Sequence, residues 1–322
     1  MEPADIQGYM RPMTISDLKN GDAALGVYGV AQHGVIDPPR GVQFSPLIPD
    51  AQALEYQPDG SLDAMVVAAP PGVLERRYVL ALALRALKTG GRLTALAPKD
   101  KGGSRLRKEL EAFGCVVTED ARRHHRICMI DRPVTLVGIE EAIAAGAPQI
   151  APKLSMWSQP GVFSWDRADP GSALLLKHLP KLSGAGLDAG CGVGLLARDV
   201  LARPTVTKLT LIDIDRRATD AARRNIEDPR AEIVQADIRD PDLKLADLDF
   251  VVMNPPFHDG GHEDKRLGQA FVQRAADLLR KGGHLWLTAN RHLPYEAALN
   301  ERFTKVELRA EEGGFKIYEA RK

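Results

Sequence analysis

Apolar residues recur along the chain in short unbroken runs, as expected for strands buried on both faces of a parallel sheet. Two of these runs, residues 62–69 and 248–253, both begin with Leu-Asp and are soon followed by two prolines. Each is then followed by helical periodicity, by Gly-Gly (90–91 and 282–283) and by a further strand pattern. This alternation predicts an α/β fold with a largely parallel sheet.

The same order of features occurs twice, which predicts a duplicated domain. Residues 126–130 and 315–319 resemble each other as the final strand of an antiparallel pair in each copy. Several prolines and a glycine interrupt any regular element between residues 147 and 161. We therefore expect two Rossmann-like domains in tandem, at residues 1–150 and 151–322.

The two predicted copies differ where ligands would bind. In their common alignment, Ala68 corresponds to Asn254 and Pro71 to Phe257, so the first copy lacks an amide and a ring that the second has. The first copy also lacks a glycine-rich loop with an acidic residue at a suitable distance. We expect it to be degenerate, with the fold retained and the chemistry lost.

The second copy contains a glycine-rich loop between a predicted strand and a predicted helix, in which Gly190, Gly192 and Gly194 alternate with other residues. Glycines in such a turn let the backbone approach a ligand closely. The next predicted strand ends at Asp213, 19 residues beyond Gly194, a separation that brings a carboxylate to a ribose diol in a βαβ unit. Asp188 would repel a pyrophosphate but suits a ligand that carries an ammonium group.

Two further strand ends carry polar side chains. Asp237 follows the predicted strand at residues 232–236, where its carboxylate can accept from an exocyclic amine such as that of adenine. Asn254 ends the apolar run 248–253, because the chain cannot continue a strand through two prolines. Phe257 adds a flat stacking surface. Taken singly, each polar residue is equally well explained as a helix or strand cap.

Composition limits the remaining classes of protein. The chain has 322 residues, 44% of them hydrophobic, and a formal net charge of zero, so its global charge does not indicate a nucleic-acid or membrane partner. Its three cysteines are scattered, which fits a reducing compartment. No signal-peptide pattern or long apolar run is found, so a cytoplasmic location is expected.

Charge is nevertheless unevenly distributed along the chain. Residues 60–132 contain fourteen Lys and Arg against eight Asp and Glu, whereas the preceding 59 residues contain three against eight. Arg122, Arg123 and Arg126 are suited to contact phosphates, which would position a nucleic acid without reading its sequence. A solvated helix face is the alternative explanation for part of this excess.

The order of these motifs resembles the class I S-adenosylmethionine-dependent methyltransferases. The resemblance extends to residues 160–165 (PGVFSW), to residues 171–176 (GSALLL) and to N-P-P-F-H-D-G after the fourth strand of the second copy. It is most similar to the ribosomal RNA guanine-N2 methyltransferases of the small-subunit type, which join a degenerate copy to a catalytic one. This resemblance implies two seven-stranded methyltransferase domains in tandem, with the last strand of the sheet antiparallel.

The resemblance also implies a cofactor, S-adenosyl-L-methionine, and a set of residues around it. The expected cofactor-binding residues are Asp188, Gly190, Gly192, Gly194, Asp213, Asp237, Phe163 and Asn254. In the expected catalytic motif, the side-chain oxygen of Asn254 and the backbone carbonyl of Pro255 accept the hydrogens of a guanine N2 amine. Phe257 stacks on the base, and His258 contacts the substrate from a loop.

The expected partner is ribosomal RNA or the small ribosomal subunit, with no membrane, no metal and a monomeric protein. His258, Asp259, His262 and Glu263 are poor candidates for a metal site, since two glycines separate the histidines. Two alternatives remain open from the residues. One is methyl transfer to an adenine amine or a protein glutamine amide, and the other is a nonenzymatic RNA-binding or ribosome assembly factor.

Overall fold

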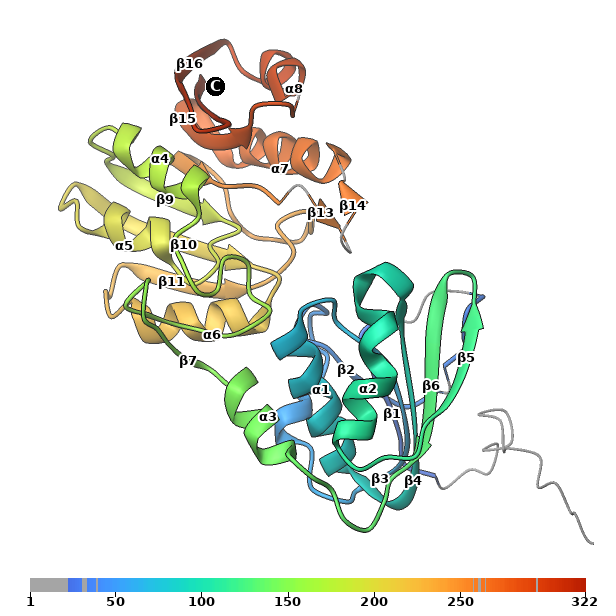
Figure 1. The fold of residues 1–322 in the computed structure, drawn as a ribbon. Coiled ribbons are helices and arrows are strands. Elements are labelled where there is room, and N and C mark those ends of the chain that lie inside the picture. Colours follow the sequence, from blue (N-terminus) through green and yellow to red (C-terminus); the bar gives the residue numbers. More distant parts are fainter. Residues whose placement is uncertain are drawn as a thin grey trace, which may run out of the picture. The chain divides into compact units, whose positions relative to one another are not determined.

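The computed structural model describes the chain at residues 23–30, 34–38, 40–256, 258–259, 262–263, 265–293 and 295–322. It contains two compact units, each with its own sheet (Figure 1). The first unit comprises Met1–Ser45 with Gln52–Ala145, and the second comprises Gly146–Lys322 together with the short segment Pro46–Ala51. The segment Pro46–Ala51 therefore groups with residues far from it in the sequence.

The second unit is built on a seven-stranded sheet with the order β11-β10-β9-β12-β15-β17-β16. Its strands are β9 (Gly184–Ala189), β10 (Val206–Asp213), β11 (Ala231–Gln235), β12 (Leu248–Met253), β15 (Leu279–Asn290), β16 (Lys305–Glu312) and β17 (Phe315–Arg321). The first five are parallel, whereas β17 is antiparallel to both of its neighbours. The expected seven strands with an antiparallel last strand are thus confirmed for this unit.

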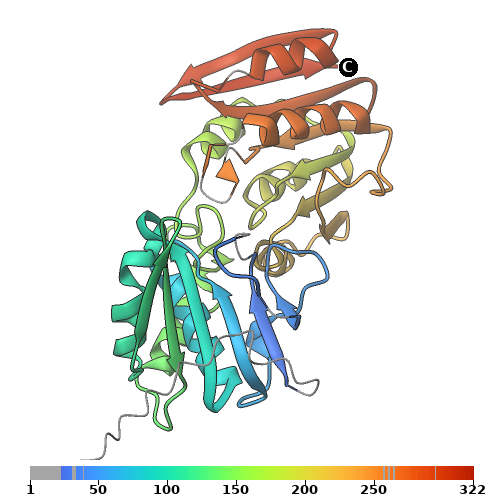
Figure 2. The same cartoon turned by 90° about the vertical axis from the view of Figure 1, so that its right-hand side faces the viewer.

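Helices cover both faces of this sheet (Figure 2). They are α4 (Pro170–His178), α5 (Leu195–Leu201), α6 (Arg216–Asn225), α7 (Lys265–Leu278) and α8 (Tyr295–Arg302). Successive residues of β12 enter opposite cores: Val251 and Met253 pack with α7 and α8, while Phe250 and Val252 pack with α4, α5 and α6. Burial on both faces explains the unbroken apolar run in the sequence.

A small antiparallel pair precedes the sheet of the second unit and packs against α6. The pair consists of β7 (Gln149–Ala151) and β8 (Met156–Ser158). Asn225 at the end of α6 accepts from the Trp157 N–H at 2.7 Å and donates to the Trp157 and Val193 carbonyls, both at 2.9 Å. These hydrogen bonds join the segment before α4 to the turn between β9 and α5.

The first unit has a six-stranded sheet in its described residues, with the order β2-β1-β3-β4-β6-β5. Its strands are β1 (Leu25–Tyr28), β2 (Val42–Phe44), β3 (Leu62–Ala68), β4 (Leu87–Pro98), β5 (Thr118–Arg122) and β6 (His125–Asp131). Its helical elements are η2 (Leu54–Tyr56), α1 (Val73–Ala86), η3 (Lys99–Gly103), α2 (Ser104–Ala112) and α3 (Ile139–Gly146). The order matches that of the second sheet without a counterpart of β11.

The expectation of seven strands in both copies therefore requires correction for the first. After β2 the chain forms only the single turn η2 before it enters β3. In the second unit the corresponding path from β10 includes α6 and β11. The first unit therefore has no counterpart of β11, the strand that Asp237 follows in the second unit.

The turn after β3 in the first unit is occupied by a buried arginine. Arg76 is fully buried, donates to the carbonyls of Pro70 at 3.1 Å and Pro71 at 2.7 Å, and forms two hydrogen bonds of 2.7 Å with Glu109. The carbonyl groups that follow this strand are consequently satisfied within the unit. An internal donor thus occupies the turn that corresponds to the Asn254 turn of the second unit.

We predict that Arg76→Met destabilises the first unit by about 3–5 kcal/mol, because it leaves the Glu109 carboxylate buried without its partner. The double change Arg76→Met with Glu109→Leu should recover most of this loss, since it removes both charges. Urea unfolding of the full-length variants would measure both effects. Equal destabilisation by the single and double changes would contradict the explanation.

Candidate active site

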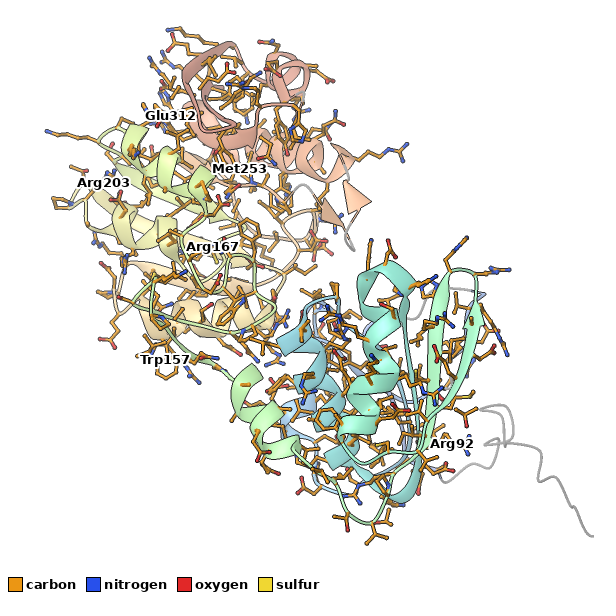
Figure 3. The ribbon with its side chains drawn as sticks, viewed as in Figure 1. Arg92, Trp157, Arg167, Arg203, Met253 and Glu312 are labelled. Carbon is orange, nitrogen blue, oxygen red and sulfur yellow. The ribbon has the colours of Figure 1, made fainter. Side chains whose placement is uncertain are left out.

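The register of β9 brings the carboxyl ends of three strands to the same level. Asp188 pairs with Leu211 of β10 and with Val252 of β12, and Ala189 pairs with Ile212 and Met253. The residues that follow, Gly190, Asp213 and Asn254, therefore meet at one edge of the sheet. Figure 3 labels Met253, the last residue of β12, beside this edge.

A cavity of about 420 Å³ opens at this edge, within the size range of small-molecule sites. The expected site residues that line it are Phe163, Gly190, Gly192, Asp213, Asp237, Asn254 and Pro255. Other residues in its wall include Leu47, Gly161, Val162, Asp215, Arg239, Pro256, Leu267 and Phe271. A cavity therefore lies at the edge of the sheet where the order of the motifs predicts a ligand site.

The alternating glycines follow from the backbone path of the turn after β9. Gly190, Gly192 and Gly194 have φ values of 74°, 54° and 88°, a region that L side chains rarely adopt. A Cβ atom added at Gly192 would meet nothing within 4 Å, so a side chain there would project into open space at the cavity. Gly194 is the N-cap of α5 and is not part of the cavity wall.

Asp213 is joined to this turn by hydrogen bonds. Its Oδ2 accepts from the Gly192 N–H at 2.8 Å, and its Oδ1 accepts from the Asp215 N–H at 2.9 Å. Burial raises the pKa of Asp213 to about 6, an effect that these N–H donors oppose. A carboxylate at the end of β10 that faces the cavity is suited to the two hydroxyls of a ribose.

Asp188 lies at the end of β9 and is fully buried, without being part of the cavity wall. No donor in the described residues forms a hydrogen bond with either of its carboxylate oxygens, although the backbone N–H of Ala197 acts against the rise of its pKa. Burial, together with the nearby Asp213 carboxylate, raises the pKa of Asp188 to about 8. An unpaired buried carboxyl group costs folding free energy unless a cationic or donor group approaches it.

Asp237 follows β11 and lines the cavity together with Arg239. Arg239 donates to both carboxylate oxygens of Asp237, at 2.9 Å from Nε and 2.6 Å from Nη2, and this lowers the pKa of Asp237. The Arg239 backbone N–H also donates to Asp237 Oδ1 at 2.9 Å, so Oδ2, which accepts from the guanidinium alone, is the oxygen better placed to accept from an amine. The sequence patterns did not indicate this partner.

Two segments outside the strand ends also contribute to the cavity wall. Gly161, Val162 and Phe163 line it from the loop before α4, and the Phe163 side chain is 59% exposed. Leu47 lines it from the segment Pro46–Ala51, whose Pro46 carbonyl accepts from the Arg216 N–H at 2.8 Å. The Leu47 contribution was missed because no local pattern links it to α6.

Asn254 presents its amide to the cavity in a defined orientation. Its Nδ2 donates to Asp169 Oδ2 at 2.8 Å and to Ser172 Oγ at 2.9 Å. No donor in the described residues reaches the Asn254 Oδ1. Pro255 and Pro256 have no backbone N–H. The turn therefore offers hydrogen-bond acceptors and no backbone donor at these two positions.

Phe257 lies outside the described residues. His258 begins the two-residue strand β13 (His258–Asp259), which pairs with β14 (His262–Glu263). Within the described residues no cluster of His, Cys, Asp or Glu could hold a metal ion. Among the helices that the structure describes, none is long and apolar enough to cross a membrane.

The three predicted RNA-contacting arginines lie on the β5–β6 hairpin of the first unit. Arg122 is paired with Asp120 at 2.9 Å, and Arg126 with Glu119 at 3.3 Å. Arg123 lies in the turn, where its φ is 44° and that of His124 is 63°. The equivalent turn of the second unit, between β16 and β17, is Gly313-Gly314 with φ values of 59° and 86°.

Comparison with known proteins identifies the family. Residues 153–319 match the family model of the methyltransferase small domain. The ribosomal RNA small subunit methyltransferase C of Pseudomonas entomophila is 34% identical over 82% of this chain and 80% of its own length. The protein of the same name from Pseudomonas paraeruginosa is 36% identical over 82% of this chain and 81% of its own length.

The chain belongs to the ribosomal RNA small subunit methyltransferase C family. A solved structure with the same fold is the 16S rRNA N2 methyltransferase of T. thermophilus in complex with AdoMet and guanosine. It has a TM-score of 0.76 and 24% sequence identity, and it covers 98% of this chain and 93% of its own. The family and the tandem fold expected from the motif order are thereby confirmed.

We predict opposite effects of Asp188→Asn on stability and on ligand binding. Because burial raises the Asp188 pKa from 3.8 to about 8, the folded protein holds a proton that the unfolded chain releases, and stability falls as the pH rises from about 4 to about 8. At pH 8 the neutral amide should therefore raise the melting temperature by a few degrees. Scanning calorimetry measures this, with the exposed Asp242→Asn as the control.

The same substitution should weaken the binding of a ligand that carries an ammonium group. At pH 7 Asp188 is mostly protonated, so wild-type binding should release more protons than binding to the Asp188→Asn variant. Titration calorimetry of S-adenosylmethionine in two buffers of different ionisation enthalpy measures the release. Wild-type binding without proton release would show that Asp188 does not meet the ammonium.

Proposed function

We propose that this protein transfers a methyl group from S-adenosyl-L-methionine to the exocyclic N2 amine of a guanine in small-subunit ribosomal RNA. The observation that carries the proposal is the acceptor-only turn at Asn254, Pro255 and Pro256 beside the cavity. An exocyclic amine has two hydrogens to donate, so this turn complements it. The relatives named above act on ribosomal RNA according to their names.

The cavity has the groups needed to hold the cofactor. Asp213 would accept hydrogen bonds from the ribose hydroxyls, and Asp237 would accept one from the adenine amine. The buried Asp188, which lies next to the glycine turn, would attract the ammonium group of the cofactor. When bound, S-adenosylmethionine supplies an electrophilic methyl group on a sulfonium. Gly190 and Gly192 allow the backbone to approach it, and Phe163 lies at the exposed side of the cavity.

The chain's own contribution to the reaction is the orientation and polarisation of the amine. The lone pair of an aromatic amine is delocalised into the ring, which makes the nitrogen a weak nucleophile. Asn254 Oδ1 and the Pro255 carbonyl accept its two hydrogens, fix its direction and stabilise the positive charge that develops on nitrogen. Phe257 stacks on the base, His258 contacts it, and the proton then leaves to water.

The first unit serves RNA binding in this proposal, and the whole protein acts in the cytoplasm as a monomer. Arg122, Arg123 and Arg126 contact phosphates, which positions the RNA. The support comes from the turn at Arg123 and His124. A non-glycine residue with positive φ is uncommon, and the second unit has two glycines at the equivalent turn. Retention of two basic side chains in this conformation favours a binding role over a stabilising one.

We predict that Asn254→Ala lowers the methylation rate by a factor on the order of 10² or more, since it removes an acceptor aimed at the developing charge. Binding of S-adenosylmethionine and the melting temperature should change little. The measurement is single-turnover transfer to small-subunit ribosomal RNA and to assembled subunits at saturating cofactor. Transfer at the wild-type rate would mean that Asn254 only ends the strand.

Replacing the substrate in the same assay separates the proposed function from its alternatives. Adenine amines and protein glutamine amides also have two hydrogens to donate, so transfer is measured to separated pools of ribosomal RNA, transfer RNA and protein. Product nucleosides are then identified by mass. Methylation of any pool other than ribosomal RNA, or at an adenine, would overturn the assignment of the substrate.

We predict that Arg123→Gly with His124→Gly stabilises the protein but weakens RNA binding. The left-handed conformation costs roughly 1–2 kcal/mol per residue for amino acids other than glycine, so replacement by glycine removes this cost. The larger loss of backbone entropy of glycine on folding cancels part of the gain in stability. Loss of one phosphate contact should reduce the slope of log affinity against log salt by about 1. Lys88→Ala, at the opposite end of β4, is the control. An unchanged salt slope would show that the turn does not contact RNA.

A further inference from the structure

The start of α4 holds the Asn254 amide by two hydrogen bonds that no motif in the sequence predicted. Asp169 is the N-cap of α4, and its Oδ2 accepts both from the Ser172 N–H at 2.8 Å and from Asn254 Nδ2 at 2.8 Å. Ser172 Oγ lies 2.9 Å from the same Nδ2. Both hydrogens of the amide nitrogen are thus directed toward one helix turn.

The chemistry of Asp169 determines which end of the Asn254 amide faces the cavity. An ionised carboxylate can only accept hydrogen bonds, so the group beside it must be the NH₂ end of the amide. The carbonyl end, Oδ1, is then left for the substrate. If the amide were rotated by half a turn, its oxygen would face the Asp169 carboxylate, and its nitrogen would face the amine with a donor where an acceptor is required.

The helix turn that makes these contacts is itself fixed against the sheet. A Cβ atom at Gly171 would lie 2.7 Å from the Phe315 ring of β17 and 3.0 Å from Thr288 Oγ1 of β15, so only glycine permits this approach. Pro170 at the first position of α4 has the φ that a helix start needs. Ser172 is 7% exposed. The donors and acceptors around Asn254 therefore lie on rigid elements.

We propose that Asp169 and Ser172 are positioning residues that set the orientation of the Asn254 amide and thereby make the site selective for substrates that donate hydrogen bonds. This inference rests on the proposed methyl transfer to an amine. Asp169 and Ser172 act through Asn254. Their effect is expected in the chemical step, because in the proposed function the Asn254 Oδ1 acts on the amine.

Three variants separate this role from helix capping. Asp169→Ser keeps an N-cap oxygen for α4 but has a shorter side chain that does not reach Asn254. Ser172→Ala removes the hydroxyl and keeps the backbone N–H that Asp169 caps. Asp169→Asn is the conservative variant, since the Ser172 N–H selects its carbonyl end and this oxygen retains both contacts.

The expected result in the full-length protein is a split between rate and binding. The single-turnover rate on ribosomal RNA should fall about tenfold for Asp169→Ser and about threefold for Ser172→Ala, with the RNA KM and the S-adenosylmethionine affinity nearly unchanged. Asp169→Asn should transfer methyl at close to the wild-type rate. Wild-type rates for both Asp169→Ser and Ser172→Ala would overturn the proposal.

A double-mutant cycle distinguishes positioning from a general effect on the helix. If Asp169 acts only through Asn254, then adding Asp169→Ser to Asn254→Ala should cause no further loss of rate. A further tenfold loss in the Asn254→Ala background would instead show that Asp169 acts independently of the amide, and would overturn the proposal. The residual rate of Asn254→Ala is measurable at long reaction times.

A readout without turnover keeps this inference separate from the proposed function. The side-chain NH₂ signal of Asn254, assigned by its loss in Asn254→Ala, should exchange with solvent about tenfold faster in Asp169→Ser than in the wild type. Unchanged exchange would overturn the positioning role whatever the substrate is. If the exchange is slow in the wild type and faster in Asp169→Ser, but no RNA amine is methylated, the positioning role would stand and the proposed function would be rejected.

Discussion

The register of strand β9 against its two neighbours is the constraint on which the site depends. Because β9 pairs with β10 on one side and β12 on the other, its last residues set the level at which Asp188, Asp213 and Asn254 leave the sheet. A slip of one residue would exchange the two faces of β9 and move Leu187 from one apolar core to the other, on the opposite face of the sheet. Burial on both faces therefore fixes the site as well as the fold.

The two units show how one topology loses its chemistry while keeping its core. The first unit retains the strand order apart from the outer strand, but Ala68 replaces the amide, and Arg76 donates to the Pro70 and Pro71 carbonyls after β3. A buried ion pair with Glu109 now occupies the turn that in the second unit faces a cavity. An internal donor thus lies in the first unit where the second unit has a site for a ligand.

Features encoded locally were predictable from the sequence, whereas those made by distant residues were not. The alternating glycines, the strand ending before Pro255 and the acid after β10 each follow from short-range rules about φ, proline and strand length. The hydrogen bond between Asn254 and Asp169 joins residues that lie 85 positions apart in the sequence. The Asp-Pro pair at the start of α4 predicts that Asp169 caps the helix, but it does not predict that Asp169 also binds Asn254. Leu47, the Arg239 partner of Asp237 and the six-stranded first sheet likewise depend on tertiary packing.

The second unit maintains an imbalance of hydrogen-bonding groups at one edge of its sheet. Asp188 is buried without a donor, Asn254 Oδ1 has none among the described residues, and the two prolines supply none. The buried Asp188 carboxyl lowers the stability of the unliganded fold, and the two apolar cores offset that loss. A ligand with an ammonium and an amine with two hydrogens would satisfy these acceptors. The excess of acceptors therefore makes the site selective for such partners.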